Sequence, residues 1–213
     1  MEFFLENILT IDGDACAVVL MESLGSDATI WRSARVCKGG GFCPEIPEPD
    51  VLASKIAALW KAKHRRPFDV PRIVFGVRVP LWLADHLRVY SAPFTSRTFR
   101  FCAPLEHYVP SHQLTDADGN PPSAALLAKN QSLKEYEDLR RQGVAPEDAR
   151  KVLTQNVLTE TVLPFTLRQF FRVCDERISG DAQNGTRRVV ETMLELAAAA
   201  FPAAVAAYKW ERK

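Results

Sequence analysis

The residues best suited to chemistry lie between Ala84 and Phe101, where the sequence reads ADHLRVYSAPFTSRTFRF. This span holds three arginines, two serines, two threonines and four aromatic residues. Guanidinium groups donate in a planar fork, hydroxyl groups add donors, and a loop leaves backbone N–H groups free. We therefore expect a phosphate or another polar anion here, with the aromatic residues able to stack on a planar ring. The alternative is a surface turn with solvated arginines.

The bulk composition limits what else the chain can do. Its 213 residues, 47% of them hydrophobic, suit one domain over residues 1–213 with a real core. A formal net charge of +1 argues against binding a nucleic-acid polymer or a charged membrane surface. The N-terminal sequence MEFFLENILTIDGD has no basic leader, and no apolar run reaches membrane-spanning length. We therefore expect a cytoplasmic protein without a membrane segment, and the five cysteines, an odd number, favour reduced thiols.

Metal sites and nucleophilic triads find little support. Cys37 and Cys43 flank a glycine run, but no second close pair completes a zinc site, so we expect no metal. The sequence contains no GxSxG motif, which would indicate a serine hydrolase. Cys37, beside Lys38, is the only candidate for a reactive thiol, and a structural thiol is the favoured interpretation. Four histidines show no metal-ligand spacing: His64, His86, His107 and His112.

The elements that must position the basic loop alternate between helix and strand. Apolar or alternating runs predict strands over 15–21, 72–79 and 154–164. Capping residues and apolar periodicity predict helices that begin near these positions: Ser26 or Asp27, Asp50, Pro80, Ser123, Pro146, Thr166 and Asp181. Residues 107–122 read as a loop, and the Ala-rich end reads as an amphipathic helix plus a tail. This order predicts an α+β or mixed α/β fold.

Arginines recur along the whole chain. Arg168 and Arg172 lie one helical turn apart, so they share a face, and this face borders Phe170 and Phe171. Such arginines need an acidic partner or an anionic ligand. They could pair internally with nearby acids, or several could converge on a polyanion such as a nucleotide. The set comprises Arg88, Arg97, Arg100, Arg150, Arg168, Arg172 and Arg177.

At this point the chain resembles a known family. The segments GSDATIWRSARV, KHRRPFD, VPLWLADHLRVY, EYEDLRRQGVAPEDARKVL and TLRQFFRVCDERISGDAQ, in this order, are similar to flavin-dependent thymidylate synthases from about residue 18 to residue 202. The resemblance implies α+β subunits, with a mixed or antiparallel sheet flanked by helices, in a homotetramer whose active sites are shared between chains. It also implies that FAD takes a methylene from methylenetetrahydrofolate, that NADPH reduces the flavin, and that carbon 5 of dUMP is methylated.

The resemblance also assigns roles to residues. Arg177 falls on the arginine that polarises the uracil, where a fixed guanidinium lowers the energy of a developing ring anion. The positions implied to bind the pyrimidine nucleotide are Asp85, Arg88, Ser96, Thr98, Arg100, Arg150 and Arg177. The positions implied to bind the cofactor are His64, Arg66, Arg88, Tyr90, Ser96, Thr166, Arg168 and Arg172.

The sequence departs from the family pattern in the basic loop. The family reads Arg-His-Arg where this chain reads Arg88-Val89-Tyr90, so a ring donor and a permanent charge used on FAD are missing. Arg172 is a candidate to replace the lost charge. Asp85 stands where a glutamine is usual, and an acceptor-only side chain there could prefer a different base or a ribose hydroxyl.

These departures keep other functions open. One is a methylase of UMP in nucleoside-antibiotic biosynthesis, and another is a hydroxymethylase of dUMP or dCMP in nucleotide hypermodification. A third is a non-catalytic nucleotide-binding homologue that has lost FAD, since function depends on the site and not on the fold.

Overall fold

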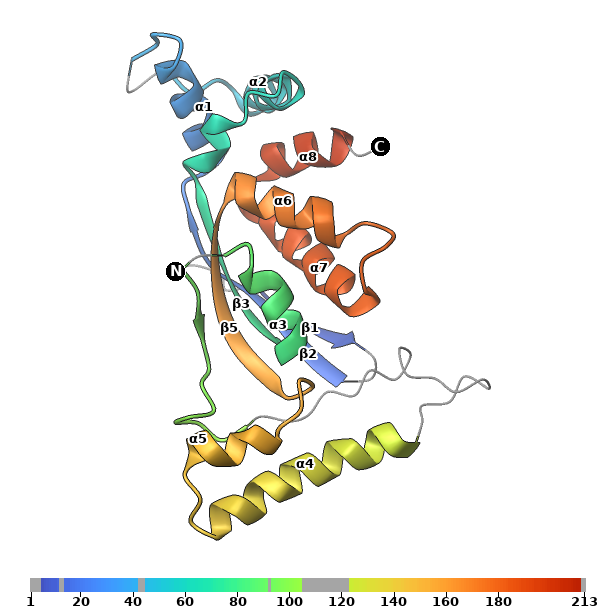
Figure 1. Ribbon diagram of the computed structural model, residues 1–213. Helices are drawn as coiled ribbons and strands as arrows, with labels where there is room; N and C mark the ends of the chain where they lie inside the picture. Colours follow the sequence, from blue (N-terminus) through green and yellow to red (C-terminus); the bar gives the residue numbers. More distant parts are fainter. Residues whose placement is uncertain (1–4, 12–13, 42–44, 92, 105–122, 212–213) are drawn as a thin grey trace.

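A five-stranded antiparallel sheet runs along the length of the molecule (Figure 1). The computed structural model describes the backbone of residues 5–11, 14–41, 45–91, 93–104 and 123–211, and the side chains of these from residue 16 except 123–130. The strands follow the order β1 (Leu5–Ile11), β2 (Asp14–Leu24), β3 (Arg72–Pro80), β5 (Leu158–Thr166) and β4 (Thr95–Ser96). The α+β fold expected from the sequence is confirmed. The loop predicted over 107–122, together with Cys43, His107 and His112, lies outside the described residues.

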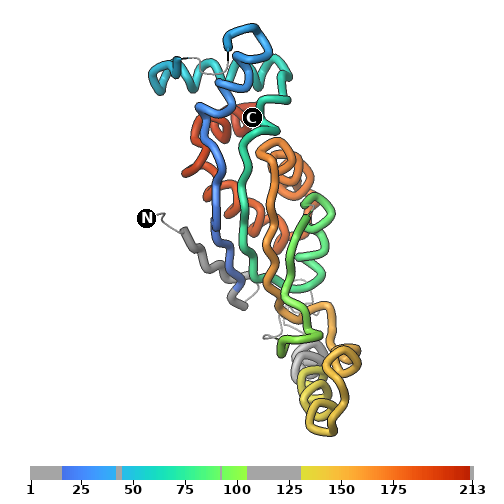
Figure 2. The backbone as a smooth tube through the Cα atoms, turned by 90° about the vertical axis from the view of Figure 1, so that its left-hand side faces the viewer, coloured from blue at the N-terminus to red at the C-terminus, as the bar shows by residue number. Residues whose placement is uncertain are grey.

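Helices cover one face of this sheet. Those packed on the strands are α3 (Leu81–Arg88), α6 (Leu167–Arg177) and α7 (Asn184–Ala200). At one end of the molecule lie α1 (Asp27–Val36), α2 (Pro49–Lys61), the short turn η1 (Arg66–Asp69) and α8 (Pro202–Glu211). At the other end lie α4 (Ser123–Arg141), α5 (Pro146–Ala149) and the turn η2 (Arg150–Val152). Figure 2 shows the opposite face of the sheet, over which no described helix passes.

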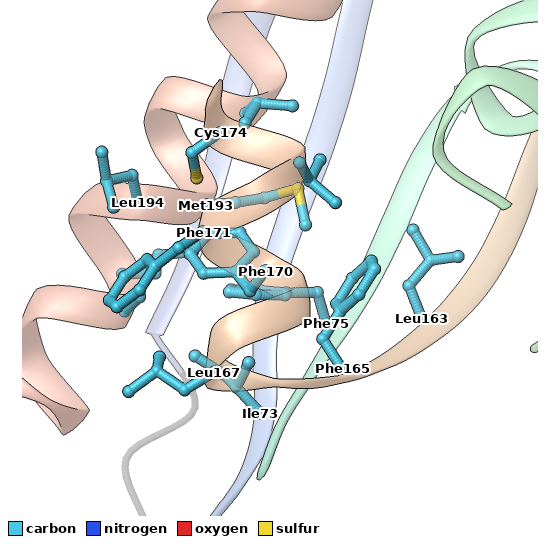
Figure 3. Packing of buried hydrophobic residues seen from close by; sticks show 14 of the residues in the cluster. Ile73, Phe75, Leu163, Phe165, Leu167, Phe170, Phe171, Cys174, Met193 and Leu194 are labelled. Atoms are coloured by element: carbon cyan, nitrogen blue, oxygen red, sulfur yellow. The ribbon is translucent and has the colours of Figure 1, made fainter. Parts of the chain in front are cut away.

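The core fills the space between the sheet and α6. In β3, Phe75 and its alternate neighbours are buried, and Phe75 pairs in register with Leu163 of β5. The rings of Phe75 and Phe165 pack 5.1 and 6.1 Å from that of Phe170 on α6 (Figure 3). Burial of large aromatic side chains is the main stabilising term of such a core. Because side chains alternate along a strand, the other faces of β3 and β5 remain available to a site.

Local capping fixes where the functional helices begin. Thr166 starts α6 as predicted: its hydroxyl accepts the backbone N–H of Gln169 at 3.2 Å, and the Gln169 side chain accepts that of Thr166 at 2.9 Å. Asp27 opens α1 and also caps α8, since its carboxylate accepts the N–H groups of Ala203 and Ala204 at 2.8 and 3.1 Å. This single residue therefore links α1 to α8, two helices far apart in the sequence.

The structure departs from the sequence analysis at four places. The N-caps of α2 and α7 are Glu48 and Gln183, where Asp50 and Asp181 were expected. Residues 5–11 form the edge strand β1, which no sequence pattern predicted. This strand pairs only with β2 in the described sheet. The Ala-rich end forms a second helix, α8, which begins directly after α7 at Pro202, a residue favoured in a first helical turn.

Candidate active site

Arg88, the last residue of α3, is held at one end of the sheet by three oxygen acceptors. Its Nη1 donates to Asp85 Oδ1 at 2.6 Å, and its Nη2 donates to Ser96 Oγ at 2.7 Å and Thr161 Oγ1 at 3.2 Å. The side chain is only 16% exposed. Its Nε–H is buried and has no partner among the described residues. The guanidinium is therefore fixed in place and keeps one buried donor for a further acceptor.

A pocket of about 410 Å³ opens beside this guanidinium. It joins the end of α3, strand β4 and the turn η2, and four residues expected to bind the nucleotide line it: Arg88, Ser96, Thr98 and Arg150. The lining also includes the cations Arg97 and Lys151 and no described carboxylate. A concave site with hydroxyl donors and several cations suits a phosphate-bearing ligand.

Two carboxylates that do not line the pocket each pair with one of these cations. Glu160 accepts Arg78 Nη2 at 2.6 Å and Arg97 Nη1 at 3.4 Å, and Asp148 accepts Lys151 Nζ at 2.6 Å. The Arg78 hydrogen bond is the largest cause that lowers the pKa of Glu160. Glu160 therefore stays ionised in the neutral range and partly balances the basic site.

A second cluster lies on α6 and the end of α3. The Tyr90 hydroxyl donates to Glu176 and accepts from Arg177 Nη2 at 3.0 Å. The Arg177 guanidinium lies 5.3 Å from the centre of the Tyr90 ring, and Glu176 also accepts Arg172 Nε at 3.1 Å. Burial, followed by the Glu176 hydrogen bond, raises the pKa of Tyr90, so the phenol is neutral. The Nε–H of Arg177 is buried without a described partner.

His86 faces the same cluster and was not predicted as a site residue. Burial, followed by the positive charge of Arg177, lowers its pKa, so the imidazole is neutral at neutral pH. Its ring packs edge-on against Trp82 at 5.7 Å. The sequence signal that could have found it is its place on α3, three residues after Leu83 and two before Arg88.

The expected cofactor residues form a third group at the N-terminal end of α6. Arg168 Nη1 pairs with Asp69 Oδ2 at 3.1 Å, and the Thr166 hydroxyl donates to the same carboxylate at 3.4 Å. Asp69 belongs to η1, which packs on α6 and begins with the exposed Arg66. Half-buried His64 lines a separate pocket between α1 and α2.

The remaining predicted residues are divided among these places. Asp85 and Arg88 are bonded to each other, but Arg100 is exposed and stacks its guanidinium 5.4 Å from the Phe101 ring, outside the pocket. Arg177 also lies outside that pocket. One chain therefore spreads the predicted site residues over several places, although Arg168 and Arg172 line one pocket on α6, and their roles stay predictions. Thr161, which anchors Arg88, was missed because its position depends on strand pairing.

The family model described as "Thymidylate synthase complementing protein" matches residues 19–203. The chain belongs to this family. A flavin-dependent thymidylate synthase of Thermus thermophilus is 29% identical over 220 residues, covering 96% of this chain and 80% of the relative. The enzyme of that name from Anaplasma marginale is 27% identical over 210 residues, covering 90% of this chain and 71% of the relative.

A solved structure shares the fold. The UMP/dUMP methylase PolB from Streptomyces cacaoi, bound with 5-Br dUMP, superposes with a TM-score of 0.78 at 22% identity and covers 91% of this chain and 94% of its own. The resemblance to flavin-dependent thymidylate synthases is thus confirmed, with this chain as a divergent member. No helix among the described residues is long and apolar enough to cross a membrane. Within the same residues, no three His, Cys, Asp or Glu side chains gather as a metal site would require.

Proposed function

We propose that this protein methylates carbon 5 of a pyrimidine nucleoside monophosphate, with dUMP as the first substrate to test. The observation that carries the proposal is the pocket in which Arg88, Ser96, Thr98 and Arg150 meet. Family membership supports the same assignment, because relatives over most of the chain are flavin-dependent thymidylate synthases.

The nucleotide phosphate fits the basic end of this pocket. Arg88 is held by Asp85, Ser96 and Thr161, so its guanidinium needs little rearrangement to donate to a phosphate oxygen. Arg150 begins the turn η2 and supplies a second cation to the lining of the pocket. The hydroxyl groups of the pocket provide the remaining donors for a phosphate or a ribose.

Arg177 is proposed to stabilise the pyrimidine ring as it loses its carbon-5 proton. Its guanidinium is oriented by Tyr90, and its buried Nε–H lacks a partner in the part of the chain described. A fixed positive charge beside a developing anion stabilises the transition state more than the ground state. Since Arg177 and the Arg88 pocket are separate in one chain, we propose that a second subunit completes each site.

The uncovered sheet face supports such an assembly. It carries a depression of about 550 Å³ in which the apolar residues Val19, Met21 and Val162 lie beside the charged Arg78, Arg97 and Glu160. Apolar surface of this kind favours contact between subunits. A homotetramer, as the family resemblance implies, is the assembly we propose, and light scattering on the purified protein would test it.

The donor set at the start of α6 fits FAD, which the family resemblance implies. Thr166 and Arg168 share Asp69, and both guanidinium and hydroxyl donors suit a pyrophosphate. We propose that these two residues and Arg172, with Arg66 from the neighbouring turn η1, hold the cofactor, whereas His64 lines a separate pocket. When bound, FAD supplies one-carbon carriage and hydride transfer, with methylenetetrahydrofolate and NADPH as co-substrates.

A second candidate substrate is UMP. The solved structure with a TM-score of 0.78 is that of a protein named as a UMP/dUMP methylase. Both proposals are tested by incubating the protein with FAD, NADPH, methylenetetrahydrofolate and dUMP, UMP or dCMP in parallel. Mass spectrometry should find one nucleotide heavier by a methylene group. A hydroxymethyl product would contradict the methylase assignment, and unchanged nucleotides with a colourless protein would indicate a binding homologue.

A further inference from the structure

Helix α3 presents two faces to its surroundings. One carries Arg88, which lines the Arg88 pocket. The other carries Trp82 and His86, which lie four residues apart and therefore one above the other on the helix. Tyr90 follows four residues later, in the turn that continues α3, and its hydroxyl accepts from Arg177 Nη2 at 3.0 Å. This second face therefore places His86 beside the Arg177 cluster, close enough for the Arg177 charge to act on the imidazole.

The His86 imidazole is held in place, yet its nitrogens remain available. The ring is half-buried and packs edge-on against Trp82, with the ring centres 5.7 Å apart. Its nitrogens have no hydrogen-bond partner among the described residues. Burial lowers the pKa of His86 most, the charge of Arg177 lowers it further, and Asp85, which is paired with Arg88, raises it. A neutral imidazole with a free nitrogen is suited to accept a proton.

The other groups around Arg177 are poorly suited to that task. Glu176 already accepts the Tyr90 hydroxyl and Arg172 Nε, and these two hydrogen bonds are the main causes that lower its pKa. A carboxylate stabilised in its ionised form is a weak base. The Tyr90 phenol keeps its proton, because burial and the Glu176 hydrogen bond raise its pKa. Within the described part of this cluster, His86 is therefore the group able to take up a proton near neutral pH.

Resting on the proposed function, we infer that His86 is the base that removes the carbon-5 proton of the nucleotide. Carbon 5 first bonds to the one-carbon unit of methylenetetrahydrofolate with the electron pair of the ring double bond. The C–H bond at carbon 5 then breaks, and its electron pair restores the double bond between carbons 5 and 6. The proton moves to a ring nitrogen of His86, which later releases it to water. Arg177 holds the pyrimidine ring beside the imidazole while this bond breaks.

The test follows tritium release from carbon 5 of dUMP in single-turnover reactions with protein whose flavin is reduced beforehand. His86→Gln keeps a polar side chain of similar size but cannot take the proton. Loss of a general base slows a reaction by about 10²–10⁴-fold, so release should slow by about 100-fold or more at nearly unchanged dUMP affinity. His86→Ala should be equally slow and should recover part of the rate when imidazole is added, and less with the weaker base 4-bromoimidazole. Arg177→Ala is the matched control, since added imidazole should not restore it.

Release by His86→Gln at a rate close to that of wild type would overturn the inference. A slow His86→Ala variant that neither added base restores would overturn it too, and would leave His86 a structural role. The proposed methylation is judged separately, by the methylated nucleotide that the wild-type protein forms. Methylation by wild type with fast release in His86→Gln rejects only the base, whereas no methylated nucleotide from wild type rejects the reaction on which the inference rests.

Discussion

The Tyr90→Phe substitution removes one hydroxyl group that joins Glu176 to Arg177. The ring itself, 5.3 Å from the Arg177 guanidinium, is retained. A hydrogen bond to a charged group contributes about 1.5–3 kcal/mol, and partial exposure of Tyr90 reduces this to roughly 1–1.5 kcal/mol. If that energy orients Arg177 for the transition state, kcat should fall by about tenfold. The KM for the nucleotide should change little, because the Arg88 pocket is untouched.

Steady-state kinetics with dUMP, or whichever nucleotide proves to be the substrate, separates these two parameters. Tyr136→Phe is a matched control, since it deletes the same hydroxyl from a buried tyrosine on α4. Its kcat should stay within about twofold of wild type, as for a substitution away from the site. A rise in KM at unchanged kcat for Tyr90→Phe would refute the reasoning and make Tyr90 a binding residue only.

The alkaline stability of the protein gives a second readout of the same contact. Burial and the Glu176 hydrogen bond raise the pKa of Tyr90 above its ordinary value of 10.0, so folding favours the neutral phenol. This contribution is complete below pH 10.0 and is lost as the pH rises through the raised value. Urea unfolding at increasing pH should show this loss in wild type and not in Tyr90→Phe. Parallel alkaline profiles would contradict the placement of the hydroxyl.

Three further substitutions test other parts of the structure. Arg150→Ala should raise the KM for the nucleotide about tenfold or more at nearly constant kcat, since a charged phosphate contact contributes about 1.5–3 kcal/mol; equal losses in both parameters would contradict a binding role. Asp27→Ala should lower the free energy of unfolding by about 1–2 kcal/mol in urea, because Ala203 loses its capping acceptor; unchanged stability would exclude the cap. Glu160→Gln should make the free energy of unfolding less sensitive to acid. The lowered pKa of Glu160 stabilises the folded protein above pH 4.5, and this stabilisation is lost as the pH falls through the depressed value. Urea midpoints of wild type and Glu160→Gln should therefore converge in acid, and a constant gap would refute the Arg78 pairing.

Much of the fold could be predicted from short-range patterns. Apolar residues alternate along 72–79 because one face of this strand packs on the core. The cap at Thr166 depends only on Gln169, three residues later. The edge strand β1 carries no such signal, because its sequence LENILTI mixes polar and apolar residues and its partner decides its structure.

The site itself depends on contacts that are distant in sequence. Arg88 finds Thr161 only because β4 pairs with β5 so that Ser96 lies opposite Thr161. No hydrophobic periodicity in the sequence predicts that register. The resemblance assigned both Arg88 and Tyr90 to cofactor contacts, but the end of α3 turns them toward different neighbours, the pocket and Glu176.

The structure places Arg172 close to Tyr90, where the hypothesis that Arg172 replaces the missing charge requires it. Arg172 pairs with Glu176, and Glu176 accepts the Tyr90 hydroxyl, so the two residues share one carboxylate. Whether this charge supports flavin binding stays a prediction. Arg172→Ala should lower flavin occupancy of the purified protein, measured by its visible absorbance, and unchanged occupancy would reject it.

The most direct test of the central claim follows the carbon-5 proton of the nucleotide. The protein is incubated with FAD, NADPH, methylenetetrahydrofolate and dUMP or UMP labelled with tritium at carbon 5. We predict release of tritium to water together with a methylated nucleotide, and loss of both in Arg177→Ala. A nucleotide that binds tightly in the Arg88 pocket but keeps its tritium under all these conditions would contradict the account.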